Sequence, residues 1–228
     1  MKLIHKTAYS AICIMLLFFV SGCDKTVTDF GFDGAISGRI VDQAGNIVAG
    51  DITSTALSVK ALGQGDIVTI DMRVKGDGTY QNKKLSPKMH KIFITGPVTP
   101  VDDTLRIDFS TTKTVTHDFV VVPFITINKP AIAGNPAANE VTISYEMTPN
   151  DGKTVTKREV YCSTNPYPNT STGTGPYFHT VKTTLSTNSG SKTITGLTSG
   201  TIYFLRIGAQ ASGTSSLNFS DQITFTTP

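Results

Sequence analysis

The segment EVTISYEM, residues 140–147, alternates apolar and polar residues without a break. Its valine, isoleucine, tyrosine and methionine fall on one face, with single polar residues between them. A period of two is typical of a β-strand that buries one face and exposes the other. Asn150-Asp151-Gly152 supplies turn residues just beyond it, and the segment 158–163 is predicted to be the next strand.

The first half of the chain shows the same alternation. A strand is predicted at 36–42, with a turn at 43–46, and another strand at 67–74. The Gly-rich segment 75–79 then predicts a tight hairpin. Further strands are predicted at 91–95, 105–109 and 114–122, whereas 53–62 is ambiguous because it also fits a helical period. The pattern as a whole predicts an all-β protein.

Composition agrees with strands and narrows the classes of function. Thr is the commonest residue of this 228-residue, 24.4 kDa chain, which has no Trp and only 16% charged residues. The formal net charge is +3, and two of the 20 basic residues, Lys2 and Lys6, lie in an N-terminal leader. That leaves 18 basic against 17 acidic residues. Such a balance argues against a nucleic-acid binder and against a polybasic membrane patch.

Residues 1–22 have the organisation of an export signal. A positive region with Lys2 and Lys6 precedes an apolar stretch at 11–20, shorter than the roughly 20 residues of a membrane-spanning helix. Ser21-Gly22-Cys23 resembles the end of a bacterial lipobox, which implies cleavage before Cys23 and acylation of its thiol. Residues 23–33 are then a lipidated tether, and a membrane is the expected partner of the N-terminus.

Segment 196–209, GLTSGTIYFLRIGA, resembles the signature of fibronectin type III domains. The resemblance implies that Tyr203 forms a tyrosine corner, in which its hydroxyl returns to nearby backbone. The Trp that this family usually packs in its core is missing, and we expect Tyr145 to fill that volume. Residues 123–228 are therefore expected to form a fibronectin type III-like, immunoglobulin-like β-sandwich.

Residues 34–122 resemble a different β-sandwich, the transthyretin-type fold of carboxypeptidase regulatory-like domains. The chain departs from that family at one corner, where Lys88 replaces the usual Gly. The expected fold class is thus all-β, with two tandem β-sandwiches that meet near Pro123. The matching residues are Gly38–Asp42 with Gly45, Asp77–Tyr80, Leu85–Pro87 and Lys91–Ile94.

The order of lipobox, regulatory-like sandwich and fibronectin-like sandwich resembles a group of two-domain Bacteroidetes lipoproteins of unassigned function. Segments 96–104 and 118–124 carry the nearest likeness. The group is associated with starch-utilisation-type glycan uptake loci. The resemblance therefore implies an outer-membrane lipoprotein at the cell surface, with the periplasmic face as the alternative. It also implies a polysaccharide or oligosaccharide ligand and an outer-membrane glycan transporter complex as partner.

The sequence contains no recognisable catalytic or metal-binding constellation. Four His occur, and none is spaced to share a metal with another His or a Cys. His90 is expected in a turn and His117 on the solvent face of a strand. Cys162 is expected to be a buried, inert thiol. The sequence thus predicts a protein that is not an enzyme and uses no cofactor, metal or nucleic acid.

A long insertion at 165–185 is the one candidate for ligand binding. Aromatic rings on a polar, Gly-rich loop can stack against sugar rings, while amides and hydroxyls supply hydrogen bonds. The opposite interpretation is that the aromatic pair at 177–178 only packs the loop onto the sandwich. The lack of Trp also weakens the case for a flat aromatic surface on which a sugar ring could stack. The predicted ligand-binding residues are Tyr167, Asn169, Tyr177, Phe178 and His179.

Two functions from different classes follow. The first is a non-catalytic, lipid-anchored accessory protein that binds glycan in a polysaccharide-uptake system. The alternative is a fimbrillin-like or adhesin subunit, since such subunits also combine a lipobox with stacked β-sandwiches. They polymerise after cleavage at an Arg, and the only early arginine here, Arg39, lies inside a predicted strand.

Overall fold

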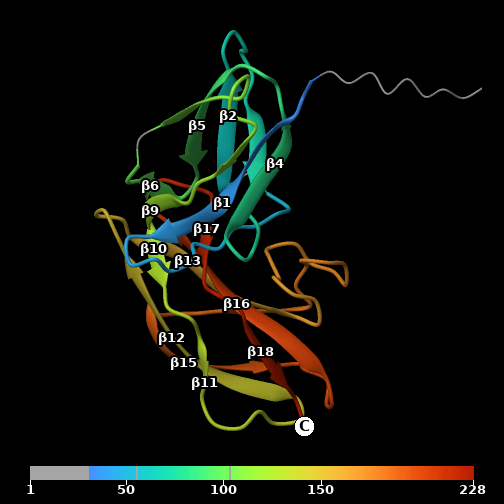
Figure 1. Ribbon diagram of the computed structural model, residues 1–228. Helices are drawn as coiled ribbons and strands as arrows, with labels where there is room; N and C mark the ends of the chain where they lie inside the picture. The colour runs from blue at the N-terminus through green and yellow to red at the C-terminus, as the bar shows by residue number, and fades with distance from the viewer. Residues whose placement is uncertain (1–30, 55, 103) are drawn as a thin grey trace, which may run out of the picture. The chain divides into compact units, whose positions relative to one another are not determined.

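The computed structural model describes residues 31–228 apart from 55 and 103, and this part of the chain is built from β-strands (Figure 1). No helix occurs among these residues, and in particular none long and apolar enough to cross a membrane. The prediction of an all-β fold is confirmed. The predicted signal peptide, the predicted lipidation site Cys23 and most of the predicted tether lie outside the described residues.

The first sandwich consists of two sheets that pack around one hydrophobic cluster. One sheet contains β4 (Thr79–Leu85), β1 (Gly34–Asp42), β9 (Phe119–Pro123), β6 (Val98–Pro100) and β8 (Thr114–Thr116). The other contains β3 (Ile70–Arg73), β2 (Ser58–Gly63), β5 (Met89–Thr95) and β7 (Leu105–Asp108). Strand β1 pairs antiparallel with β4 and parallel with β8 and β9. The cluster draws its buried members from residues 36–121 of both sheets.

Three predicted elements of this sandwich differ from the structure. The strand predicted at 67–74 begins only at Ile70, because Gly65 turns the chain at φ 83° and residues 64–69 form the β2–β3 connection. The Gly-rich 75–79 is a tight turn, but β3 pairs with β2 and β4 with β1, so the turn joins the two sheets and makes no hairpin. The strand predicted at 114–122 is two strands, β8 and β9.

The second sandwich has its own pair of sheets and its own cluster. One sheet contains β10 (Ile125–Ile127), β12 (Glu140–Pro149), β11 (Ala131–Ile132) and β15 (Ser189–Thr195). The other contains β14 (Val181–Thr184), β13 (Val155–Ser163), β16 (Ile202–Ala211), β17 (Leu217–Phe219) and β18 (Ile223–Thr226). Buried residues from 125–225 fill the space between them, and Tyr145 is among them.

The fibronectin-like signature folds as the resemblance implies. Tyr203 lies in β16 with its ring buried and stacked near Phe225, at 5.8 Å between centroids. Its hydroxyl oxygen accepts a hydrogen bond from the backbone N–H of Thr198, at 3.0 Å. The tyrosine corner is therefore present, and it fixes the connection that precedes β16.

The two sandwiches are joined by a very short connection, because β9 ends at Pro123 and β10 begins at Ile125. Asn218 reinforces this connection from β17. Its buried amide donates to the carbonyl oxygen of Pro97 at 3.0 Å and accepts from the N–H of Ile125 at 3.1 Å. Thr99 adds a hydrogen bond to Asp151 at 2.6 Å. The described chain from Phe32 onward forms one compact unit.

Candidate functional site

The predicted ligand-binding insertion forms the loop between β13 and β14, and it spans 164–180 because β14 begins at Val181. The loop folds back on itself. The N–H of Asn169 donates to the carbonyl oxygen of Tyr177 at 2.7 Å, and the N–H of His179 donates to that of Ser171 at 2.9 Å. Backbone hydrogen bonds thus tie its outgoing and returning halves together.

His179 stabilises this loop from inside. Its ring is 3% exposed, and Nδ1 lies 2.8 Å from the carbonyl oxygen of Asn169 while Nε2 lies 3.2 Å from the hydroxyl of Thr172. The ring also packs against Tyr161 of β13, at 5.4 Å between centroids. Because both ring nitrogens have protein partners, His179 acts as a structural residue here.

Asn169 and Tyr167 connect the loop to the first sandwich. The fully buried amide of Asn169 donates to Asp51 Oδ1 at 3.0 Å and to the hydroxyl of Thr53 at 2.6 Å. The ring of Tyr167 covers Gly76, where an added Cβ would lie 2.2 Å from the ring. These two predicted ligand contacts therefore belong to the junction between the sandwiches.

Arg206 completes this junction, and no sequence pattern indicates its role. Its buried guanidinium donates to the carbonyl oxygens of Pro168 at 2.5 Å and Gly50 at 2.9 Å, and it stacks 3.9 Å from the centroid of Phe219. Burial lowers the pKa of Arg206 to about 10, with a nearby carboxylate, Asp51, offsetting part of that effect. The group is still a cation at neutral pH.

A second buried polar group lies beside the loop. The Tyr161 hydroxyl donates to the carboxylate of Glu159, which also pairs with Lys157 at 2.9 Å and Lys182 at 3.5 Å. Burial and this carboxylate raise the pKa of Tyr161. Burial opposes ionisation of Glu159, but the Tyr161 hydroxyl and Lys157 outweigh it and lower the pKa of the carboxyl.

The remaining predicted residues, Tyr177 and Phe178, are half-buried. The Phe178 ring lies over Gly173, where an added Cβ would come within 2.8 Å of it. Tyr177 adopts a left-handed backbone conformation with φ 67° at the point where the loop returns. The structure thus leaves these two rings reachable from solvent while it buries Asn169 and His179, so the five predicted residues do not form one open site.

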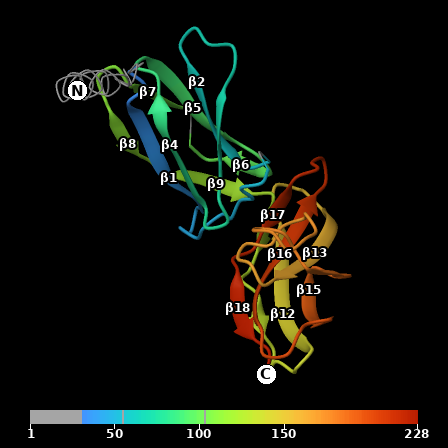
Figure 2. The ribbon, with the colours of Figure 1, turned by 90° about the vertical axis from the view of Figure 1, so that its right-hand side faces the viewer.

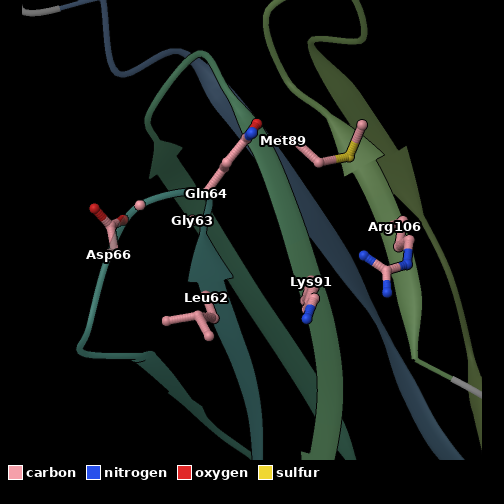
Figure 3. A pocket seen from close by; sticks show the side chains of 8 residues that line it. Leu62, Gly63, Gln64, Asp66, Met89, Lys91 and Arg106 are labelled. Atoms are coloured by element: carbon pink, nitrogen blue, oxygen red, sulfur yellow. The ribbon is translucent and has the colours of Figure 1, made fainter.

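A separate pocket of about 510 Å³ lies on the outer face of the first sandwich (Figure 3). Leu62, Lys91 and Arg106 are cross-strand neighbours on β2, β5 and β7 and form its floor. Met89 and the 63–66 segment form its rim. The pocket combines aliphatic surface with two cations on its floor and the carboxylate of Asp66 on its rim, and no aromatic side chain lines it.

The other groups considered for chemistry are unsuited to it. Cys162 is fully buried, and burial raises the pKa of its thiol to about 12. His90 is buried within β5 and packs on Phe109, so its predicted turn position is wrong. His117 is half-buried with its ring edge against Phe119, which corrects its predicted place on a solvent face. No cluster of three metal-ligating side chains occurs among the described residues.

Comparisons with known proteins support the fold. No family model matches the chain, and no curated protein matches it. The fold is similar to that of a DUF3823 family protein from Parabacteroides merdae, with a TM-score of 0.66, 14% identity, and 84% of this chain and 98% of that chain covered.

Two further crystal structures are similar over almost the same range. One is a DUF3823 family protein from Bacteroides ovatus, with a TM-score of 0.63, 17% identity, and coverage of 84% and 97% of the two chains. The other is a protein from Bacteroides uniformis that has been proposed to bind carbohydrate, with a TM-score of 0.67, 19% identity, and coverage of 86% and 100%. These likenesses show that the chain shares an all-β fold with DUF3823 proteins.

Proposed function

We propose that this chain is a non-catalytic, lipid-anchored accessory protein that binds glycan through the loop 164–180. The observation that carries the proposal is the way this loop is held. Buried contacts of Asn169 and His179 fix its backbone, while Tyr177 and Phe178 remain half-exposed. A preordered loop loses less conformational entropy on binding than a flexible one.

The chemistry of the loop favours a neutral, hydroxyl-rich ligand. Residues 164–180 contain no Asp, Glu, Lys or Arg, and hydroxyl, amide and aromatic side chains predominate. Aromatic faces pack against the C–H faces of sugar rings, and hydroxyls and amides exchange hydrogen bonds with sugar hydroxyls. Fold similarity to a Bacteroides uniformis protein proposed to bind carbohydrate supports the same class of ligand.

The proposed location is the outer membrane, at the cell surface, with an acylated Cys23 as anchor and an outer-membrane glycan transporter complex as partner. Its support is the lipobox-like Ser21-Gly22-Cys23 at the end of an apolar leader. Metabolic labelling with an alkyne fatty acid tests the anchor. We expect label on the wild-type chain and none on Cys23→Ala, and an unlabelled wild-type chain would contradict the anchor.

Glycan binding is tested by probing an array of polysaccharides with the purified chain. We expect retention on a restricted set of neutral glycans, and a chain that binds none of them would contradict the proposal. The bound glycan is then incubated with the chain and its reducing ends are counted. Non-catalytic binding predicts an unchanged number, whereas new reducing ends would reveal an enzyme.

A further inference from the structure

The first sandwich has one end that is distant from the second sandwich. Strands β1 and β2 run between the two ends. Residues that follow β1 and precede β2 contact the second sandwich: Ala49 pairs with Phe219, and the carbonyl of Gly50 accepts from Arg206. The opposite end, here called the distal end, comprises residues 32–35, 61–70, 82–92 and 105–113.

The chain from the proposed anchor enters the fold at this distal end. Gly34, the first residue of β1, pairs with Leu85 at the end of β4. Three residues further on, Lys88 forms an ion pair with Asp66 of the β2–β3 connection, at 2.6 Å. The beginning of β1 and the β2–β3 connection therefore lie at the same end of the first sandwich (Figure 2).

Exposed apolar side chains are concentrated there. Ile67 and Val68 at the tip of the connection are 98% and 72% exposed. Isolated exposed apolar residues are ordinary on protein surfaces, but a concentration of them marks an interaction surface. Seven large apolar side chains are exposed among the described residues, and five of them belong to the distal end: Phe32, Ile67, Val68, Ile70 and Met89.

Positive charge accompanies these residues. The distal end holds six Lys and Arg but only three Asp, although the whole chain is nearly balanced. The pocket of Figure 3 lies at this end, and its floor carries Lys91 and Arg106 side by side on β5 and β7. The distal end therefore carries a net positive charge, although basic and acidic residues are nearly balanced over the whole chain.

We propose that the distal end docks on an anionic membrane surface, with Ile67 and Val68 in the interfacial layer and Lys91 and Arg106 facing lipid phosphates. Interfacial binding strengthens with buried apolar area and with attraction to anionic lipids, and both are present here. The inference rests on the proposed lipid anchor and is independent of glycan binding.

The tether makes this docking geometrically accessible. Nine residues lie between Cys23 and Asp33, so the chain from one to the other spans at most about 35 Å. An anchor that close keeps the distal end at a high effective concentration near the bilayer, which converts a weak surface contact into a populated one. Docking would orient the first sandwich so that the axes of β1 and β2 extend from the membrane toward the second sandwich.

The absence of Trp from the chain provides a direct test. Full-length Ile67→Trp, purified with its own N-terminus, is reconstituted into vesicles of phosphatidylglycerol and phosphatidylcholine. Its matched control is Ile202→Trp, at a 56%-exposed position of the second sandwich. Docking predicts that the indole at 67 emits at shorter wavelength and is quenched by brominated acyl chains, while the indole at 202 is not.

The charge contribution is tested by Lys91→Gln with Arg106→Gln in the Ile67→Trp chain. Each cation near an anionic surface changes binding by about fivefold, so the pair lowers the ratio of docked to undocked protein by about 30-fold. Quenching should therefore fall on anionic vesicles, and it should fall much less on purely zwitterionic ones. Equal quenching of the double variant and its parent would contradict the phosphate contacts.

The mass of the N-terminal peptide shows whether the chain is acylated. It therefore distinguishes a failure of the lipid anchor from a failure of docking. If the chain is acylated but the indole at 67 has the same emission wavelength and the same degree of quenching as the indole at 202, the docking proposal is wrong and the anchor is unaffected. A chain without acyl groups would overturn both. A blue shift that depends on protein concentration and not on vesicles would also overturn docking, because it would assign this surface to a second copy of the chain.

Discussion

Arg206 of the second sandwich donates a hydrogen bond from Nη1 to the carbonyl oxygen of Gly50 in the first sandwich, at 2.9 Å. The same guanidinium reaches the carbonyl oxygen of Pro168, the residue before Asn169 in the proposed glycan-binding loop. One buried cation thus joins the first sandwich, the second sandwich and the loop. The orientation of the loop is therefore coupled to the junction between the sandwiches.

Replacement of Arg206 by Met should weaken the fold. The change leaves two buried carbonyl oxygens without their donors, and each such group costs about 1–3 kcal/mol. We expect the free energy of unfolding, measured with urea, to fall by at least that amount. Arg106→Met, at an exposed position, is the control and should change stability little. A fully stable Arg206→Met chain would show that the junction does not depend on this cation.

Two substitutions of Asn169 distinguish the loss of its hydrogen bonds from the introduction of a charge at this position. Asn169→Ala removes the donor to Asp51 and Thr53 and should cost about 1–3 kcal/mol. Asn169→Asp instead places a carboxylate against that of Asp51, and repulsion between the two raises the folded pKa of the introduced group. Stability of that variant should therefore fall further as the pH rises from 4 to 7. A pH-independent difference between Asn169→Asp and wild type in denaturant titrations would contradict this arrangement.

The tyrosine corner predicts a smaller, local effect. Tyr203→Phe keeps the buried ring but leaves the N–H of Thr198 without its acceptor, at a cost of about 1 kcal/mol. Tyr145→Phe is a suitable comparison, because among the described residues its hydroxyl bonds only to the exposed Thr187. Thermal unfolding should show the larger shift for Tyr203→Phe, and the reverse order would be inconsistent with this role.

Glu159 should make stability depend on pH in the acid range. Its folded pKa lies below the ordinary value of 4.5 because the Tyr161 hydroxyl and Lys157 outweigh the opposing effect of burial. A depressed folded pKa contributes stability above the unfolded pKa, and that contribution is lost as the pH falls from about 4.5 through the folded pKa. Glu159→Gln should therefore lose less stability than wild type between pH 5 and pH 3. Parallel curves for the two chains would refute this assignment.

Much of the fold could be predicted because strand signals are local. The alternation at 140–147 indicates a strand with one buried face, and this holds whichever element packs on that face. The structure has β12 at 140–149, as this pattern predicts. The alternation at 67–74 was misleading for the same reason. It shows which residues are apolar, but the chain turns at Gly65, so Ile67 and Val68 lie in an exposed connection and not in a strand.

The site was less predictable because it depends on contacts between distant segments. Asn169 and His179 are polar residues of a segment predicted to be an exposed loop, but Asn169 is buried against Asp51, which is 118 residues away in sequence. Arg206 follows the alternation of β16, which places it on the face opposite the core, and no local pattern indicates that the first sandwich covers that face. Only the folded junction identifies these residues.

The central claim, that the held loop presents Tyr177 and Phe178 to a glycan, is tested most directly by affinity electrophoresis. The wild-type chain, the double variant Tyr177→Ala with Phe178→Ala, and the control Ile202→Ala are run in gels with and without a glycan that the array identifies. We predict that the glycan retards the wild type and the control but not the double variant, whose unfolding curve should remain close to that of wild type. Equal retardation of all three chains would place binding elsewhere and contradict the account.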